Sequence, residues 1–155
     1  MSSARVVTMM SGAGDVPLAP DDVLEALFAT ISYRLEPNGW ASRFPTVLDR
    51  LHEGRLDVAS ADAALSELEL ISAELKKLPA DRVVWSMRDL ARKDDSRHPV
   101  RRDARNAYEY FIARDGRPIL ACLVDAVRVA RASGEPVILA SGLRFKNMVR
   151  QGPLC

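Results

Sequence analysis

The sequence predicts an α+β domain, in which three to four helices pack on a small sheet of short strands. Two observations favour this fold class. Apolar residues recur three and four positions apart over residues 61–78, which is the period of a helix with one buried face. Short runs rich in β-branched residues occur at 5–10 and 136–140, and each is delimited by glycine or proline. No signal fixes the strand order, so a mixed α/β arrangement stays open as an alternative.

The chain has the length and composition of one globular domain, spanning residues 1–155. It holds 155 residues, of which 48% are hydrophobic and 28% are charged. These values exclude disorder and low-complexity sequence as descriptions of the whole chain. No apolar run approaches the roughly 20 residues of a membrane-spanning helix, and the apolar patch near residue 10 is shorter than the core of a signal peptide. We therefore expect a cytoplasmic protein with no membrane partner.

The N-terminal part predicts a strand followed by a helix. The strand covers Arg5–Met10 and ends at the serine and glycines that follow. The helix opens at Pro20, because the two aspartates after it suit a helix N-terminus. Its buried face is formed by Val23, Leu24, Leu27, Phe28 and Ile31. We interpret residues 32–35 as an extended connection to the turn Pro37-Asn38-Gly39.

A short helix is predicted after this turn, over residues 44–53. Pro45 fits its first turn, where no N–H partner is lost, and Gly54 is suited to the position after its end. Residues 55–57 are interpreted as a brief connector to the next helix.

The clearest helix of the sequence covers Ala61–Leu78. Ser60 is expected to cap its N-terminus, and Pro79 stops it. Leu70 widens its apolar face in this interpretation.

The remaining chain is expected to alternate between short strands, turns and helices. The expected elements are a strand at 82–85, a further helical turn at 86–93, a polar loop at 94–103, a strand at 108–112, a helix from Pro118 to about Ala132 and a strand at 136–140. The dipeptide Asp115-Gly116 separates the second of these strands from the helix, which Gly134 ends. Residues 141–155 form either a tail or one more helical turn.

Residues that could carry catalysis or bind a metal are few and dispersed. Cys122 lies in an apolar run and Cys155 ends the chain, so we expect a packed core thiol and no disulfide. His52 is expected at a solvated helix end and His98 in a charged loop, and neither has an assignable catalytic partner. Aspartates between 89 and 95 could bind a divalent cation, but neighbouring basic residues neutralise them. The sequence therefore indicates no enzyme, no cofactor and no metal site.

Charge is distributed unevenly along a chain whose net charge is +1. Residues 53–81 carry three basic and seven acidic side chains. Four of the acidic ones lie on the polar face of the clearest helix, namely Asp62, Glu67, Glu69 and Glu74. This face is either an ordinary solvated surface or a docking surface for a basic protein partner, whose association the complementary charge would speed.

Basic residues gather further along the chain, at 92–105. This segment offers an alternative function, that of a small nucleic-acid-binding module. Its arginines are interspersed with aspartates, and no stacking aromatic residue precedes Tyr108. Because the net charge of the chain is also close to zero, nucleic acid is the less favoured partner.

The two tryptophans have different settings in the sequence. Trp85 ends an apolar run, so we expect it in the core. Trp40 directly follows the turn that contains Asn38. It is therefore either a core residue or, together with Asn38, an exposed anchor for a partner.

Three uncommon strings occur in a fixed order within residues 30–140. They are Gly-Trp-Ala-Ser-Arg-Phe-Pro at 39–45, Leu-Pro-Ala-Asp-Arg-Val-Val-Trp at 78–85 and Tyr-Glu-Tyr-Phe-Ile-Ala-Arg-Asp-Gly-Arg at 108–117. Together they resemble the immunity protein 70 family of bacterial polymorphic-toxin systems. The resemblance implies an inhibitor that binds a cognate toxin domain and neutralises it by stoichiometric occlusion, without catalysis.

The resemblance supplies no catalytic residues, so the interface is placed from the residues themselves. We expect it on the acidic helix face and around the turn, at Asn38, Trp40, Asp62, Glu67, Glu69 and Glu74. Association of the chain with itself is also compatible with the sequence.

Overall fold

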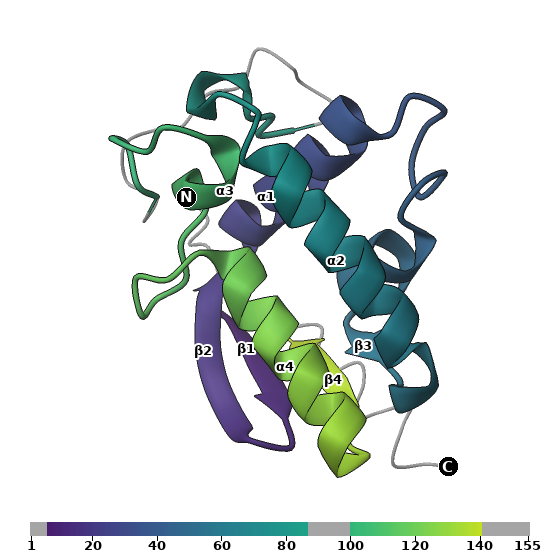
Figure 1. The fold of residues 1–155 in the computed structure, drawn as a ribbon. Helices are drawn as coiled ribbons and strands as arrows, with labels where there is room; N and C mark the ends of the chain where they lie inside the picture. Colours follow the sequence, from purple (N-terminus) through teal and green to yellow (C-terminus); the bar gives the residue numbers. More distant parts are fainter. Residues whose placement is uncertain (1–5, 87–99, 141–155) are drawn as a thin grey trace.

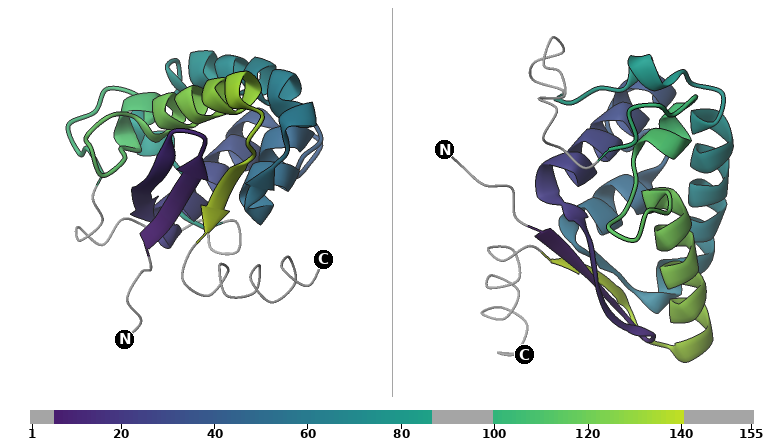
Figure 2. Two further views of the ribbon diagram at one scale, coloured as in Figure 1. Left: turned by 90° about the horizontal axis from the view of Figure 1, so that it is seen from below. Right: turned by 90° about the vertical axis from the view of Figure 1, so that its left-hand side faces the viewer.

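A sheet forms one layer of the molecule and the helices form the other (Figure 1 and Figure 2). The computed structural model describes residues 6–86 and 100–140. Within these residues, four antiparallel strands form one sheet in the order β2-β1-β4-β3. The strands are β1 Val6–Ser11, β2 Gly14–Pro20, β3 Arg55–Leu56 and β4 Val137–Ala140.

Three helices of 15 residues each make up most of the second layer: α1 Asp21–Leu35, α2 Ala61–Leu75 and α4 Ile119–Ser133. α4 lies over β1, β2 and β4 and packs along α2 (Figure 1). Shorter elements join them: the π-helix η1 Thr46–Leu51, the 3-10 turns η2 Val58–Ser60 and η3 Ala80–Arg82, and the short helix α3 Ala107–Tyr110. The α+β class predicted from the sequence is confirmed.

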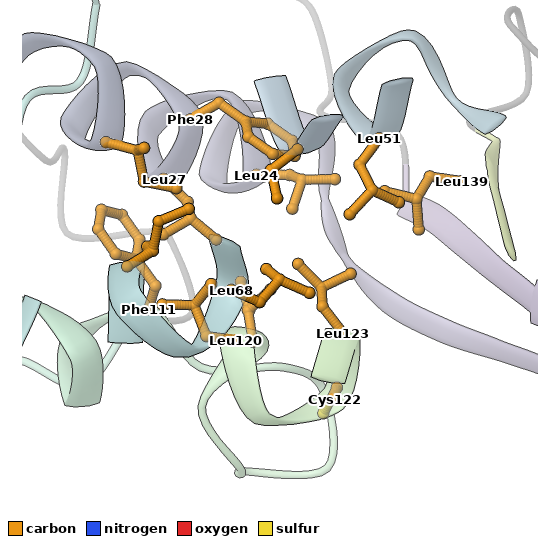
Figure 3. Packing of buried hydrophobic residues seen from close by; sticks show 14 of the residues in the cluster. Leu24, Leu27, Phe28, Leu51, Leu68, Phe111, Leu120, Cys122, Leu123 and Leu139 are labelled. Atoms are coloured by element: carbon orange, nitrogen blue, oxygen red, sulfur yellow. The ribbon is translucent and has the colours of Figure 1, made fainter. Parts of the chain in front are cut away.

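Leucines from both layers meet in one core (Figure 3). Figure 3 shows Leu27 of α1, Leu68 of α2 and Leu120 of α4 converging, with Leu51 of η1 beside Leu139 of β4. Each of these side chains is at most 1% exposed. Because Leu51 belongs to this core, its burial holds η1 against the sheet.

The first strand is one half of a hairpin whose second strand the sequence analysis missed. The strand expected at 5–10 is confirmed as β1, and β2 pairs with it in antiparallel register. β2 contains Pro17 and ends at Pro20. Prolines argue against a central strand but are tolerated at a sheet edge, which is where β2 lies.

Two predicted connections belong to regular elements instead. Residues 32–35, expected to be extended, complete α1, where buried Ser32 and Leu35 continue its inner face. The expected connector at 55–57 contains β3, whose Arg55 and Leu56 pair with β4. A strand of two residues carries too little periodicity to be recognised in sequence.

The clearest predicted helix is present but ends earlier than expected, at Leu75. Beyond it the N–H groups of Lys77 and Leu78 donate to carbonyls three residues back, which is the tighter 3-10 pattern. Leu70 is 44% exposed, so it does not widen the buried face. Ser60 occupies the N-cap position as expected, although its side chain makes no capping hydrogen bond.

The strand predicted at 82–85 is wrong, because side chains of α1 occupy the backbone groups that a strand would use. The N–H of Val84 donates to Oγ1 of Thr30 at 2.8 Å. The Thr30 hydroxyl donates to the carbonyl of Ala26 at 2.8 Å, with the carbonyl of Val84 at 3.2 Å as the alternative acceptor. Nε of Arg34 donates to the carbonyl of Arg82 at 2.8 Å. This segment is therefore fixed to α1 rather than to a neighbouring strand.

The strand predicted at 108–112 is also wrong, since its first residues form α3. The side chain of Asn106 accepts a hydrogen bond from the N–H of Glu109 at 2.9 Å and so caps this helix. Next to it, Trp85 is 5% exposed and packs against the ring of Tyr110 at a centroid distance of 6.4 Å. The expectation that Trp85 belongs to the core is confirmed.

The C-terminal elements agree with the sequence prediction. The helix expected from Pro118 is α4, which Gly134 ends with a φ of 78°, and the last strand is β4. The predictions for 86–93, 94–103 and 141–155 fall largely or wholly outside the described residues, as do His98 and Cys155. Within the described ranges, no helix combines the length and apolarity needed to cross a bilayer.

Candidate partner-binding surface

The loop between α1 and η1 is organised around one buried carboxylate. Glu36 is 4% exposed. It accepts hydrogen bonds from the backbone N–H groups of Ala41 at 2.8 Å, Arg43 at 3.1 Å and Phe44 at 2.9 Å. Charge-assisted bonds of this kind compensate the burial of a carboxylate and satisfy donors that a loop leaves open. The loop that contains the turn is therefore held in one conformation.

Two carboxylates of α2 bind the end of this loop and the start of the helix that follows it. Glu67 accepts the N–H of Val47 at 2.8 Å and that of Thr46 at 3.2 Å, and so caps the helix that contains η1. Glu74 forms an ion pair with Arg43. The hydrogen bond from Arg43 is the main reason that the pKa of Glu74 is lowered from its ordinary value. The sequence prediction of a helix over 44–53 is confirmed, with a π-helix at its centre.

Backbone strain marks the centre of this loop. Among the described residues, Ala41 alone has a positive φ without being a glycine, at 63°. Its neighbour but one, Gly39, has a φ of 103°. A left-handed conformation costs a residue with a Cβ atom on the order of 1–3 kcal/mol, and it persists where surrounding contacts impose it. Here the N–H of Ala41 is held by its hydrogen bond to Glu36.

Trp40 lies between Gly39 and Ala41 and is 41% exposed. Its ring packs edge-on against His52, with 4.9 Å between centroids. His52 in turn packs edge-on against Phe28, with 5.3 Å between centroids, and Phe28 is 2% exposed. Nε2 of His52 lies 2.6 Å from a carboxylate oxygen of Glu25 on α1. Trp40 is thus an exposed aromatic side chain on a rigid base, and we call Trp40, His52 and Glu25 the Trp40 platform.

Sequence reasoning found only part of this platform. It proposed Trp40 as either anchor or core, and the structure exposes the ring. It placed His52 at a solvated helix end, whereas 28% of the side chain is exposed and the ring lies between two aromatic residues. It missed Glu25 and Glu36, because a carboxylate that binds residues elsewhere in the fold has no local signature. Asn38 is exposed in the turn, as expected.

The acidic face of α2 is less open to a partner than its composition indicates. Besides the contacts of Glu67 and Glu74, Asp62 pairs with Arg131 of α4 at 3.0 Å, and Glu69 lies 3.8 Å from Arg128. All four candidate carboxylates therefore have partners within the chain. Asp62 and Glu69 remain well exposed, with 82% and 63% of their side chains accessible, whereas Glu67 and Glu74 are half-buried against the loop.

The other candidate groups show no assembled chemistry in the described part of the chain. Cys122 is 3% exposed, and burial raises the pKa of its thiol. No three His, Cys, Asp or Glu side chains gather there in a way that could hold a metal ion. Of the basic segment 92–105, the described Arg101 pairs with Asp103 at 3.3 Å.

Comparison with known protein families identifies this chain's relatives. The model of the family described as immunity protein 70 matches residues 12–139, which include the whole Trp40 platform and its supporting carboxylates. No curated protein and no solved structure matches the chain. Since the matched residues make up most of the sequence, the chain belongs to the immunity protein 70 family.

Proposed function

We propose that this protein binds a cognate bacterial toxin domain and neutralises it by stoichiometric occlusion, without catalysis. Membership of an immunity protein family supports a toxin as the partner. The observation that carries the binding mode is the exposed Trp40, mounted on His52 and held by a loop whose backbone bonds to Glu36. In this proposal the toxin is made by the same cell or delivered by a sibling, as in contact-dependent inhibition, and the complex forms in the cytoplasm.

A preorganised aromatic anchor is well suited to this task. Tryptophan is among the residues that contribute most to protein interfaces, particularly near the centre of a desolvated patch. Binding costs conformational entropy for each side chain and loop that becomes ordered, and a loop already fixed by three backbone bonds to Glu36 avoids much of that cost. A stable interface buries on average about 800 Å² on each partner, so the contact would extend beyond Trp40 to neighbours such as Asn38.

Co-expression with the product of the adjacent upstream gene tests this proposal. The neighbour expressed alone should stop growth, and this chain should restore growth and co-purify with the neighbour in equal amounts. A chain carrying Trp40→Ala should restore less growth at the same expression level, whereas Val16→Ala, which alters an equally exposed apolar side chain on the edge strand, should protect fully. A neighbour that is harmless and forms no complex would contradict the proposal.

A further inference from the structure

We propose that Asn38 is a site of spontaneous covalent modification, at which the side-chain amide is lost and the residue becomes aspartate or isoaspartate. The reaction needs only water, and it takes place two residues before Trp40. Three features support it: the glycine that follows Asn38, the freedom of the Asn38 side chain and the weak hydrogen bond of the attacking nitrogen. The chemistry is independent of the proposed function, whereas its consequence for binding rests on that function.

The reaction joins the asparagine side chain to the backbone nitrogen of the next residue. After a base removes its proton, the nitrogen of Gly39 attacks Cγ of Asn38. A bond forms between these two atoms, the bond from Cγ to Nδ2 breaks, and the amide group takes up a proton and leaves as ammonia. Water then opens the resulting five-membered succinimide ring. Cleavage between the nitrogen and Cγ gives aspartate, and cleavage between the nitrogen and the backbone carbonyl carbon gives isoaspartate.

The first feature is the residue that supplies the nitrogen. Gly39 has no Cβ to hinder the attack, and glycine adopts backbone angles that other residues avoid. Within the described structure, no atom of another segment lies within 4 Å of the position that a Cβ would take at Gly39. Both Asn38 and Gly39 are exposed, so base and water reach the reacting atoms.

The other two features are clear from a comparison with Asn106. Oδ1 of Asn106 accepts the N–H of Glu109 at 2.9 Å, and the N–H of the next residue, Ala107, donates to a backbone carbonyl at 2.8 Å. In the described part of the chain, the Asn38 side chain makes no hydrogen bond. The N–H of Gly39 lies 3.3 Å from its acceptor, which is longer than the usual 2.7–3.2 Å. The reacting groups are therefore fixed at Asn106 and loosely held at Asn38.

Modification of Asn38 would change the loop that presents Trp40. The succinimide leaves the Gly39 nitrogen without a proton, so its hydrogen bond to the carbonyl of Glu36 is lost. Isoaspartate then routes the backbone through its own Cβ, which adds one atom to the loop. Because the carboxylate of Glu36 fixes the backbone from Ala41 onward, the added length displaces the residues between. We expect Trp40 to shift from its contact with His52, and the modified chain to bind the toxin domain more weakly.

Peptide mapping of the aged protein tests the chemistry without any toxin. The purified chain is incubated at pH 7 and at pH 9, digested with trypsin and compared with a fresh sample that is digested in the same way. Trypsin releases residues 35–43, in which Asn38 is the only side-chain amide, and residues 106–114, in which Asn106 is. The first peptide should gain about one dalton in a growing fraction of molecules, faster at pH 9, while the second stays unchanged. A first peptide that changes no faster than the second overturns the proposal.

Two variants separate the consequence for binding from general ageing of the sample. Asn38→Gln keeps an amide but would need a less favourable six-membered ring, so its affinity for the toxin domain should survive the same incubation. Asn38→Asp introduces the charge without the added backbone atom, so the fresh variant should bind nearly as well as wild type. In aged wild type, the fraction that binds tightly should fall by the fraction converted to isoaspartate. Tight binding by the isoaspartate form overturns this consequence, whereas a fresh chain that binds no toxin contradicts the proposed function instead.

Discussion

The carboxylate of Glu36 accepts a hydrogen bond at 2.9 Å from the backbone N–H of Phe44, eight residues further along the chain. The same carboxylate bonds the N–H groups of Ala41 and Arg43. The Glu36 carboxylate therefore supplies the hydrogen-bond partners that a loop lacks. Trp40 lies within the loop that these bonds close.

Glu36→Ala should destabilise the protein by about 2–4 kcal/mol, because it leaves backbone donors unsatisfied around a buried site. Urea unfolding monitored by circular dichroism measures this change. Glu53→Ala, at an exposed carboxylate near the end of the η1 helix, should change stability by less than about 0.5 kcal/mol. Similar effects of the two substitutions would show that the Glu36 contacts do not hold the loop.

Ala41→Gly should stabilise the fold by about 0.5–1 kcal/mol. Its φ of 63° is strained for alanine and relaxed for glycine, and this gain exceeds the greater entropy of glycine in the unfolded chain. Ala63→Gly is the matched control, since Ala63 is exposed within α2. There the same substitution should destabilise by about 1 kcal/mol. Denaturation midpoints that move in the same direction for both variants would contradict the strain at Ala41.

Thr30→Val should destabilise the protein by about 1–3 kcal/mol, because the buried N–H of Val84 loses the hydroxyl oxygen that accepts its hydrogen bond. Thr30→Ser keeps the hydroxyl and should recover much of that loss. Hydrogen exchange offers a local readout, in which the Val84 amide exchanges faster in Thr30→Val than in Thr30→Ser. Equal exchange rates in the two variants would mean that the hydroxyl does not protect this amide.

The ion pair between Glu74 and Arg43 should contribute stability at neutral pH and lose it in acid. The pKa of Glu74 is lowered in the folded state, mainly by the hydrogen bond from Arg43. Its stabilisation is therefore complete above the unfolded pKa of about 4.3 and is lost as the pH falls through the folded value. Both side chains are about one-third exposed, so the contribution is limited to roughly 0.2–1 kcal/mol.

Glu74→Gln, compared with wild type by urea unfolding between pH 7 and pH 3, measures this contribution. The difference in stability should shrink as the pH falls. Glu53→Gln, without a comparable ion pair among the described contacts, is the control and should show a smaller trend. A difference that stays constant or grows in acid would have the wrong sign for a lowered pKa.

Local patterns in the sequence predicted the long helices well and failed where distant residues decide the structure. The apolar period of α4, the proline before it and Gly134 after it are all local, and that helix has almost the expected bounds. The segment 82–85 has the composition of a strand, yet Thr30 and Arg34 of α1 take its backbone groups. No feature within 82–85 encodes that contact.

The same distinction applies to the partner-binding surface. The sequence predicted the turn before Trp40, and the structure shows the indole exposed. The acidic residues of α2 look alike in sequence, but Glu67 caps another helix whereas Asp62 pairs with α4. Only the fold separates carboxylates that hold the structure together from those that face solvent. It also brings Glu25 to His52, a pair that sequence spacing does not reveal.

Titration of toxin activity against added protein tests the central claim most directly. Purified toxin domain is mixed with increasing amounts of this chain at concentrations well above the Kd. Occlusion predicts that activity falls linearly and reaches zero at one equivalent, and that the Trp40→Leu variant needs an excess to reach the same inhibition. Full inactivation by a small fraction of an equivalent, or toxin activity that is unchanged at many equivalents, would contradict a stoichiometric inhibitor.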